Sequence, residues 1–500
     1  MNSKGIYALL AIFFANAAAA AEQAAYLRPL VDSIAVTPLL TVGESVPRTS
    51  NPTQSFRLIG VPDGLGLERS GGRIRLWVNH ELEKTDASQP IAGGPLQKGA
   101  FVSLFLLAPA KPDASAQIGG RAPILPPIPP IGVLSGDFAA SSFLLNGRPW
   151  EGVPALFCSG FLAGPEVGFD RPIYLTGEEA DGSQSGDGRG GLGFAFTEGR
   201  ANALPGLGRY RKENLVVVPG TGLKTVLFGL EDGPGGLKSE LYLYIGQKNL
   251  SSSDALARNG LAGGRLYVFG SATGGKSDES KFRKADRPVV GRWIPIDAPE
   301  ELTDAELDAK AAESGAFRFD RVEDGTYDRN RNGTFYFVTT GGDIPENRKG
   351  RLYRLTFNPN DPLAGPTLLE ILLEGDAGDG IVSPDNIDMN ASGEMILLED
   401  FTMGAPLEFL KRNPSVWLYR PASGEKPIRI AEVDGKFWES SGVIDASSLY
   451  GSGSWLLDVQ AHTIKSREAS QRQGLEGDAQ LVEGGQLLLL KMGSYRATQK

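Results

Sequence analysis

Cysteine and histidine are scarce in this sequence, which contains only Cys158, His80 and His462. One cysteine cannot form an internal disulfide, and two histidines are too few for a histidine-rich zinc or copper site. The chain also lacks a P-loop, a G-x-S-x-G motif, and a G-x-G-x-x-G motif in a strand-to-helix context. These absences argue against the common nucleotide-binding folds and against a serine hydrolase with a nucleophile elbow.

An excess of basic residues is missing as well. The 500 residues include 50 lysines and arginines against 60 aspartates and glutamates, which gives a formal net charge of −10. Proteins that bind nucleic acids present basic surfaces, so we expect no nucleic-acid partner. An acidic chain is better suited to holding cations.

Apolar runs long enough to cross a membrane are absent after the first residues. The chain opens with Lys4, an apolar run at residues 6–14 and small residues at 16–21. This pattern predicts a secretory signal peptide over residues 1–21. We expect residues 22–500 to form a single domain without a membrane span. The protein should then be secreted or periplasmic, and we expect a monomer.

Helical periodicity is also rare, whereas glycine and proline number 65 and 33. Short β-rich runs bounded by turn residues recur instead, and this pattern is typical of an all-β fold. One helical window, residues 299–314, has Thr303 as a possible N-cap with Glu306 three residues later. We interpret it as a short helical insertion. The clearest β-rich runs lie at residues 73–78, 172–176, 225–230, 241–245, 265–269, 334–339, 351–357, 395–398, 416–419 and 455–459.

Acidic residues stand near the ends of several β-rich segments. They are Glu81, Glu178, Glu179, Glu231, Asp232, Glu323, Asp324, Glu399, Asp400 and Asp458. These acidic sites recur loosely, roughly every 80 residues, whereas a four-stranded propeller blade needs about 40. The sequence therefore predicts a six-bladed β-propeller with long loop insertions. Its inner strands would bring these carboxylates together at the axis.

Carboxylates gathered in this way repel one another unless cations lie among them. Oxygen ligands suit Ca²⁺ or ferric iron, and Cys158 could add a thiolate. The alternative is that each acidic segment is an ordinary solvated turn. Residues 328–333 (DRNRNG) leave the same choice open, because their spacing fits both a calcium loop and a hairpin turn.

The order of the short motifs points to a family. FCSGFLAGPE around Cys158 is followed by LTGEE, LEDG, RVEDG, SPDNI and LLED. This series resembles the PhoX-type alkaline phosphatases over most of the chain after residue 21. The resemblance implies a six-bladed propeller that hydrolyses phosphate monoesters with a pair of ferric ions and with calcium ions.

The same resemblance implies roles for particular residues. Cys158 resembles the thiolate ligand of iron, Glu231 and Glu323 resemble iron-binding carboxylates, and the two glutamates of LTGEE resemble calcium ligands. Arg321 resembles the arginine that holds the substrate phosphate. The full metal-ligand set implied in this way is Cys158, Glu178, Glu179, Glu231, Glu323, Asp385, Asn386, Glu399 and Asp400.

The predicted function is that of a secreted phosphatase that acts on small phosphate monoesters with Fe(III) and Ca²⁺. A calcium-dependent propeller hydrolase of the phytase or lactonase kind is an alternative, and it would need the acidic residues but not Cys158. A second alternative is a non-catalytic propeller that binds a partner and holds a structural ion. Iron together with calcium would favour the first hypothesis, and calcium alone would favour one of the two alternatives.

Overall fold

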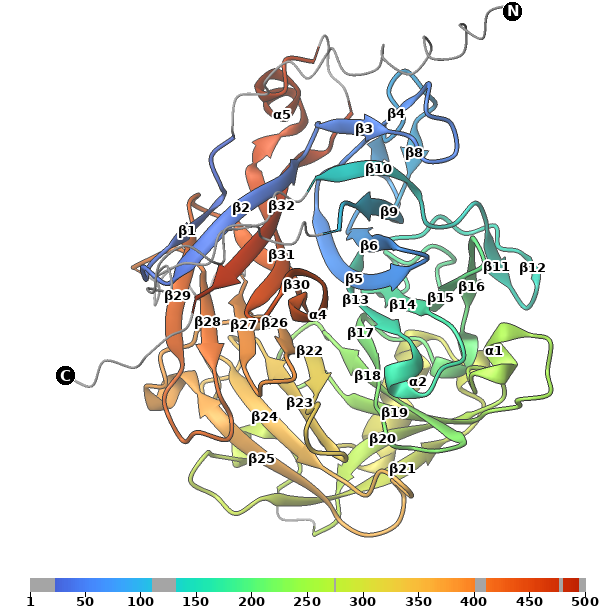
Figure 1. Ribbon diagram of the computed structural model, residues 1–500. Helices are drawn as coiled ribbons and strands as arrows, with labels where there is room; N and C mark the ends of the chain where they lie inside the picture. Colours follow the sequence, from blue (N-terminus) through green and yellow to red (C-terminus); the bar gives the residue numbers. More distant parts are fainter. Residues whose placement is uncertain (1–22, 110–131, 274–275, 401–410, 476–479, 494–500) are drawn as a thin grey trace, which may run out of the picture.

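The computed structural model describes residues 23–109, 132–273, 276–400, 411–475 and 480–493. The predicted signal peptide, residues 1–21, lies outside these ranges. Strands dominate the described chain, and its sheets are arranged around a common centre (Figure 1). None of the described helices is long and apolar enough to cross a membrane.

Six strands line the centre of this arrangement and contact one another in cyclic order. We call them the inner strands. Each is the first strand of an antiparallel unit that continues outward. The inner strands are β5 (Pro62–Ser70), β13 (Phe157–Ala163), β17 (Lys212–Val217), β22 (Val322–Tyr327), β26 (Pro384–Met389) and β30 (Glu439–Asp445).

Each inner strand begins one edge of a larger sheet. β5 leads to β6 (Arg73–His80), β9 (Phe101–Leu107) and β10 (Val133–Phe138). β13 leads to β14 (Ile173–Glu178), β15 (Gly193–Thr197) and β16 (Arg200–Ala203), with β11 (Phe143–Leu145) and β12 (Arg148–Pro149) at the far edge. β26 leads to β27 (Met395–Glu399), β28 (Ser415–Tyr419), β29 (Ile428–Val433) and β1 (Leu27–Pro29).

The sheet that contains β17 and β22 has nine strands, because two units join at their outer edges through β21 and β25. From β17 it runs through β18 (Lys224–Glu231), β19 (Leu241–Gln247), β20 (Arg265–Ser271) and β21 (Val289–Ile296). It then returns through β25 (Thr367–Glu374), β24 (Arg351–Thr356) and β23 (Thr334–Thr339) to β22. Two hairpins are separate, β3 (Ser45–Pro47) with β4 (Ser55–Arg57) and β7 (Ala87–Ser88) with β8 (Gln97–Lys98).

The remaining unit joins the two ends of the chain. β30 leads to β31 (Ser454–Lys465) and β32 (Glu483–Met492), and β2 (Ile34–Thr41) pairs antiparallel with β32. Figure 1 shows the blue β2 alongside the red β32. An early strand therefore completes the last sheet and closes the ring.

The predicted all-β class is confirmed, and the arrangement is propeller-like. Counting six blades depends on treating the nine-stranded sheet as two units. The predicted helical insertion is present as α2 (Asp304–Ser314), and Thr303 and Glu306 form the expected capping box. The other described α-helices are short: α1 (Ala255–Arg258), α4 (Ser447–Tyr450) and α5 (Ser466–Arg472).

The choice left open at residues 328–333 is resolved in favour of a hairpin. These residues connect the paired strands β22 and β23, and Gly333 has φ 77°. Asp328 accepts hydrogen bonds from the Asn330 amide and the Tyr336 hydroxyl. Its carboxylate is therefore used to hold the turn.

Candidate metal centre

Five of the six inner strands contain a β-bulge near their first residue. In each, the first residue pairs with the second strand of the unit, and two residues then lie outside the regular register. A bulge of this kind redirects side chains locally. The first unpaired residues are Asp63, Cys158, Glu213, Glu323 and Asp385. Each of these five strands thus presents, near the axis, one side chain of a type that can bind a metal.

Further carboxylates come from the second strands and from β30. Glu81, Glu179 and Asp400 follow the ends of β6, β14 and β27, and Glu439 begins β30. Within the described chain, four groups have ligand atoms lying within 4.8 Å of one another. They are Asp63–Glu81–Cys158, Cys158–Glu179–Glu213, Glu213–Glu323–Asp385 and Asp385–Asp400–Glu439. Successive groups share a residue, so they form one continuous set, which we call the axial cluster.

Burial makes the charged form of this cluster costly. Burial, followed by the charges of neighbouring acids, raises the pKa of Glu81 to about 8. Burial also raises the pKa of Asp63 to about 6. The same causes raise the pKa values of Glu179, Glu213, Glu323 and Asp385 well above their usual range. Protons or bound cations must therefore compensate the charge of these carboxylates.

Several ligand atoms of the cluster have no protein partner. Among the described residues, Asp63 Oδ1, Glu213 Oε2 and Asp385 Oδ1 are buried and accept no hydrogen bond. Orphaned buried oxygens of this kind are uncommon and are costly to desolvate. Carboxylate oxygens with one thiol sulfur form a donor set that suits calcium and ferric iron. The residues present therefore fit the predicted metals.

Two cationic side chains border the cluster. Arg321 donates hydrogen bonds from Nε and Nη2 to the two oxygens of Asp232, at 3.0 and 2.9 Å, and its Nη2 lies 3.1 Å from Glu323 Oε1. His462 lies 2.6 Å from Glu483 and 3.6 Å from Glu439. Burial alone would lower the pKa of His462, but these two carboxylates raise it to about 11. Positive charge is thus fixed on two sides of an acidic site.

Arg321 also adopts a strained backbone conformation. Its φ is 61°, and Val61, Leu156 and Ser383 have φ values of 53°, 49° and 47° at the corresponding place, two residues before the bulged ligand. Non-glycine residues rarely adopt this left-handed conformation, which tends to persist at functional sites. The repeated strain belongs to the same local geometry that turns the ligands toward the axis.

The structure brings five of the predicted metal ligands into the axial cluster: Cys158, Glu179, Glu323, Asp385 and Asp400. Asn386, also predicted, occupies the second bulge position after Asp385. Its amide donates a hydrogen bond to Ser159 Oγ at 2.7 Å and accepts one from Ser441 Oγ at 3.2 Å. Asn386 therefore links β26 to the neighbouring β30 and, across the axis, to β13.

Three predicted ligands, Glu178, Glu231 and Glu399, lie outside the cluster. Each ends a second strand and pairs with the residue just before the bulge. Since side chains alternate along a strand, they point away from the next residue, which faces the axis. Their carboxylates instead bind backbone amides. Glu178 accepts from Ala155, Gly186 and Leu192, Glu231 from Glu240, and Glu399 from Val382 and Ser415.

Substitutions of the adjacent residues Glu399 and Asp400 should therefore have different effects, the first on stability and the second on metal content. Glu399 also accepts hydrogen bonds from Trp417 Nε1 and Arg412. Glu399→Gln should lower the free energy of unfolding by about 2 kcal/mol, since donors around it lose a charged acceptor, while metal content stays unchanged. Asp400→Asn should lower metal content. Urea unfolding and elemental analysis measure both. If Glu399→Gln lost metal while Asp400→Asn retained it, the placement of Asp400 inside the cluster and Glu399 outside it would be contradicted.

Several residues of the site were not among the predicted ligands. Glu81 and Asp232 stand at strand ends that the sequence already marked, but Asp63, Glu213 and Glu439 had no such mark. A common signal is visible once the bulges are known. The ligand is followed by a small or polar residue in the pairs Asp63–Gly64, Cys158–Ser159, Glu213–Asn214, Glu323–Asp324 and Asp385–Asn386.

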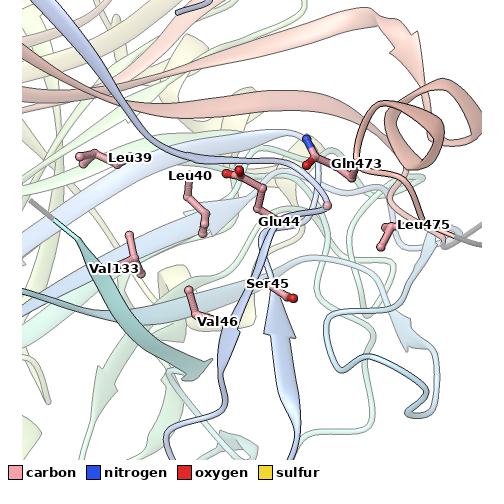
Figure 2. Close-up of a pocket in the computed structure, with 9 residues that line it drawn as sticks. Leu39, Leu40, Glu44, Ser45, Val46, Val133, Gln473 and Leu475 are labelled. Carbon is pink, nitrogen blue, oxygen red and sulfur yellow. The ribbon is translucent and has the colours of Figure 1, made fainter. Parts of the chain in front are cut away.

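A pocket elsewhere on the protein is not a competing candidate. Figure 2 shows it beside β2 and β3, with Leu39, Leu40 and Val46 in its apolar wall. Its one carboxylate, Glu44, accepts a hydrogen bond from the Thr41 amide. The pocket contains no residue of the axial cluster.

Comparison with known proteins agrees with the sequence motifs. Residues 197–411 match the family described as alkaline phosphatase PhoX. The resemblance to this family is confirmed. The PhoX match covers Glu213, Asp232, Arg321, Glu323, Asp385 and Asp400. A search of curated proteins gives no significant match.

Solved structures place the fold beside the same family. The structure of Pseudomonas fluorescens PhoX in complex with vanadate, a transition-state analogue, aligns with 92% of this chain and 95% of its own, with TM-score 0.62 and 15% identity. At this identity the alignment shows a shared fold. A luciferin-regenerating enzyme aligns over 88% and 94% of the two chains with 9% identity, but its TM-score of 0.34 is too low to support an argument.

Proposed function

We propose that this protein is a secreted or periplasmic metal-dependent phosphatase that hydrolyses small phosphate monoesters. The observation that carries the proposal is the position of Arg321, whose guanidinium is fixed by Asp232 beside the axial cluster. An arginine fork recognises phosphate oxygens in two-point contact. The PhoX match over residues 197–411 supports the same activity.

The axial cluster has two kinds of ligand group, which would suit iron and calcium respectively. Cys158 is shared by two groups of ligand atoms, so its thiolate would favour iron in that part of the cluster. Glu323, Asp385, Asp400 and Glu439 supply only oxygens, which suit Ca²⁺. When bound, these ions would act as Lewis acids that polarise phosphoryl oxygens and help to generate the attacking nucleophile.

The residues of the chain itself would bind and orient the ester. Arg321 would hold the phosphate, while Asp232 keeps the guanidinium in one orientation. Thr340 Oγ1 donates a hydrogen bond to Glu323 Oε1 at 2.6 Å and Ser159 Oγ to Glu213 Oε1 at 2.6 Å, so both carboxylates are held in place. Such supporting contacts preserve the geometry of a site during reaction.

Cys158 separates this proposal from a calcium-only hydrolase or a non-catalytic propeller. Cys158→Ser keeps the size of the side chain but replaces a soft donor with a hard one. We expect the variant to lose most of its iron and to fall at least about tenfold in kcat/KM for phenyl phosphate, while the fold is retained. Elemental analysis, circular dichroism and the phosphatase assay measure these outcomes.

The wild-type protein provides the reference for this test. It should contain iron and calcium and release phosphate from phenyl phosphate. Wild-type protein that contains calcium without iron, or a Cys158→Ser variant with unchanged iron and activity, would contradict the proposal.

A further inference from the structure

A second arginine occupies the sequence position of Arg321 in the neighbouring unit, without the positive φ of Arg321. Arg211 directly precedes β17, as Arg321 directly precedes β22, and β17 and β22 are neighbours in the ring. In each case the ligand of the axial cluster follows two residues later, as Glu213 and Glu323. Lys212, between Arg211 and Glu213, points the other way, since its Nζ donates to the Gly191 and Gly208 carbonyls. Alternation along the strand therefore directs Arg211 to the side of Glu213.

Both arginines pair with a carboxylate that follows the second strand of the preceding unit, although the two carboxylates are not at the same position. Arg321 reaches Asp232, which follows the second strand of the preceding unit, β18. Arg211 reaches Asp181, which lies shortly after the second strand of its own preceding unit, β14, with Nη2 at 2.6 Å from Oδ2. Asp181 lies two residues after Glu179, and Arg211 lies two residues before Glu213. Since Glu179 and Glu213 belong to one group of the axial cluster, the pair formed by Arg211 and Asp181 adjoins that group.

Arg211 differs from Arg321 in the number of hydrogen bonds it has already made. Arg321 uses two nitrogens on Asp232 and contacts Glu323, and its side chain is 18% exposed. Within the described chain, the one hydrogen bond of the Arg211 guanidinium is that to Asp181, and the side chain is 23% exposed. A guanidinium carries five N–H donors, so Arg211 retains donors for an anion that arrives from solvent.

The partner of Arg211 is itself held rigidly. Asp181 Oδ1 accepts hydrogen bonds from Ser183 N at 2.8 Å, Ser183 Oγ at 2.6 Å and Gln184 N at 3.2 Å. Lys84, from the segment after β6, donates from Nζ to the Ser183 carbonyl at 2.7 Å. This brings a second positive charge to the same loop. The orientation of Arg211 is therefore set before any ligand binds, which lowers the entropic cost of binding.

We propose that Arg211 binds a second anionic group on the organic part of the substrate. The inference rests on the proposed phosphatase activity, in which Arg321 takes the phosphate that is cleaved. An ester whose leaving group carries a carboxylate or another phosphate would place that group on Arg211, because the guanidinium fork fits both anions. The substrates would then be phosphate monoesters whose leaving group carries a second anionic group. Esters with an uncharged leaving group would contact Arg321 alone.

The test compares two esters that differ by one carboxylate, phenyl phosphate and 4-carboxyphenyl phosphate. Arg211→Gln should raise KM for 4-carboxyphenyl phosphate about tenfold, as expected for loss of one charged hydrogen-bonded contact. Its kcat for that ester, and both constants for phenyl phosphate, should stay near wild type. Arg211→Lys should restore part of the loss, since it keeps the charge but not the fork.

Arg171→Gln is the matched control, because Arg171 is also a partly exposed arginine that pairs with carboxylates, Asp170 and Glu198. It precedes β14, whereas Glu179 of the axial cluster follows the other end of that strand. This variant should leave kcat and KM unchanged for both esters. Equal effects of Arg211→Gln on both esters, or no effect on either, would overturn the proposed role of Arg211. The proposed phosphatase activity would still stand if the wild type hydrolyses phenyl phosphate. Hydrolysis of neither ester by the wild type would overturn both proposals.

Inorganic phosphate is the other anion that this arginine could bind, and product inhibition distinguishes it. If Arg211→Gln raises the inhibition constant of inorganic phosphate but leaves the ratio of the two esters unchanged, the site binds free phosphate and the proposed substrate contact is wrong. A changed ester ratio with an unchanged inhibition constant supports it.

Discussion

Removal of bound metal is expected to abolish phosphatase activity and to lower the Tm by several degrees. In the proposed metalloenzyme, ions would bind only the folded arrangement of the axial cluster. Each would then stabilise the fold by mass action, by about 4 kcal/mol at a thousandfold excess over its Kd. Without them, buried carboxylates such as Glu213, Glu323 and Asp385 face one another across short distances. Differential scanning calorimetry and the phenyl phosphate assay, with and without a strong chelator, measure the two effects.

The pH dependence of the metal-free protein provides a second readout. The pKa of Glu81 is raised to about 8 and that of Asp63 to about 6, so the folded state binds more protons than the unfolded state. Stability contributed in this way is present below the ordinary carboxyl pKa of about 4 and is lost as pH rises through the raised values. The metal-free protein should therefore be less stable at pH 8 than at pH 5.

Metal-loaded protein should not show this loss, since the ions replace the protons. Adding back ferric and calcium ions should restore both Tm and activity, which controls for damage by the chelator. An unchanged Tm after complete removal of iron and calcium would mean that the cluster is compensated by protons alone.

The substitution Arg321→Lys is expected to lower kcat/KM for phenyl phosphate about ten- to a hundredfold, equivalent to roughly 1.4–2.8 kcal/mol of transition-state stabilisation. Lysine keeps the charge beside Glu323 but cannot make the two-point contact with Asp232 or with phosphate. Metal content should stay near wild type, because Arg321 is not a metal ligand. Steady-state kinetics and elemental analysis give both quantities.

Two further variants make this experiment specific. Asp232→Asn leaves Arg321 in place but weakens its orientation, so it should also lower kcat/KM. Arg412→Lys changes an arginine that binds Glu399, outside the axial cluster, and should leave kcat/KM unchanged. If Arg321→Lys retains full activity, Arg321 does not hold the phosphate.

The sequence predicted the outer parts of the sheets better than the inner strands. The β-rich runs correspond to strands such as β6, β18, β23 and β31, whose apolar side chains pack between sheets. The inner strands were missed because ligands and hydrogen-bonding groups interrupt their apolar pattern. VEDGTY of β22 and PDNIDM of β26 resemble turns, yet every residue in both strands is buried. Burial against neighbouring inner strands outweighs their low β-propensity.

The metal ligands show a similar division. Cys158 could be singled out because it is the only cysteine, and the acidic strand ends marked the correct neighbourhoods. The choice between Glu178 and Glu179, or between Glu399 and Asp400, depends on which residue pairs opposite a bulge. A shift of one residue reverses the face on which a side chain lies. The sequence carries no clear mark of the bulge, so this choice needed the structure.

The pairing of β2 with β32 has a consequence for how the site is assembled in time. The side chains of the axial cluster come from all six inner strands and from the segments after β6, β14 and β27. The ring that holds them is completed by one of the first strands and the last described strand of the chain. A ribosome must therefore finish residue 492 before the ring can close. In the proposed metalloenzyme, the complete centre would then take up its metal after translation, from the ions of the compartment in which the finished chain folds.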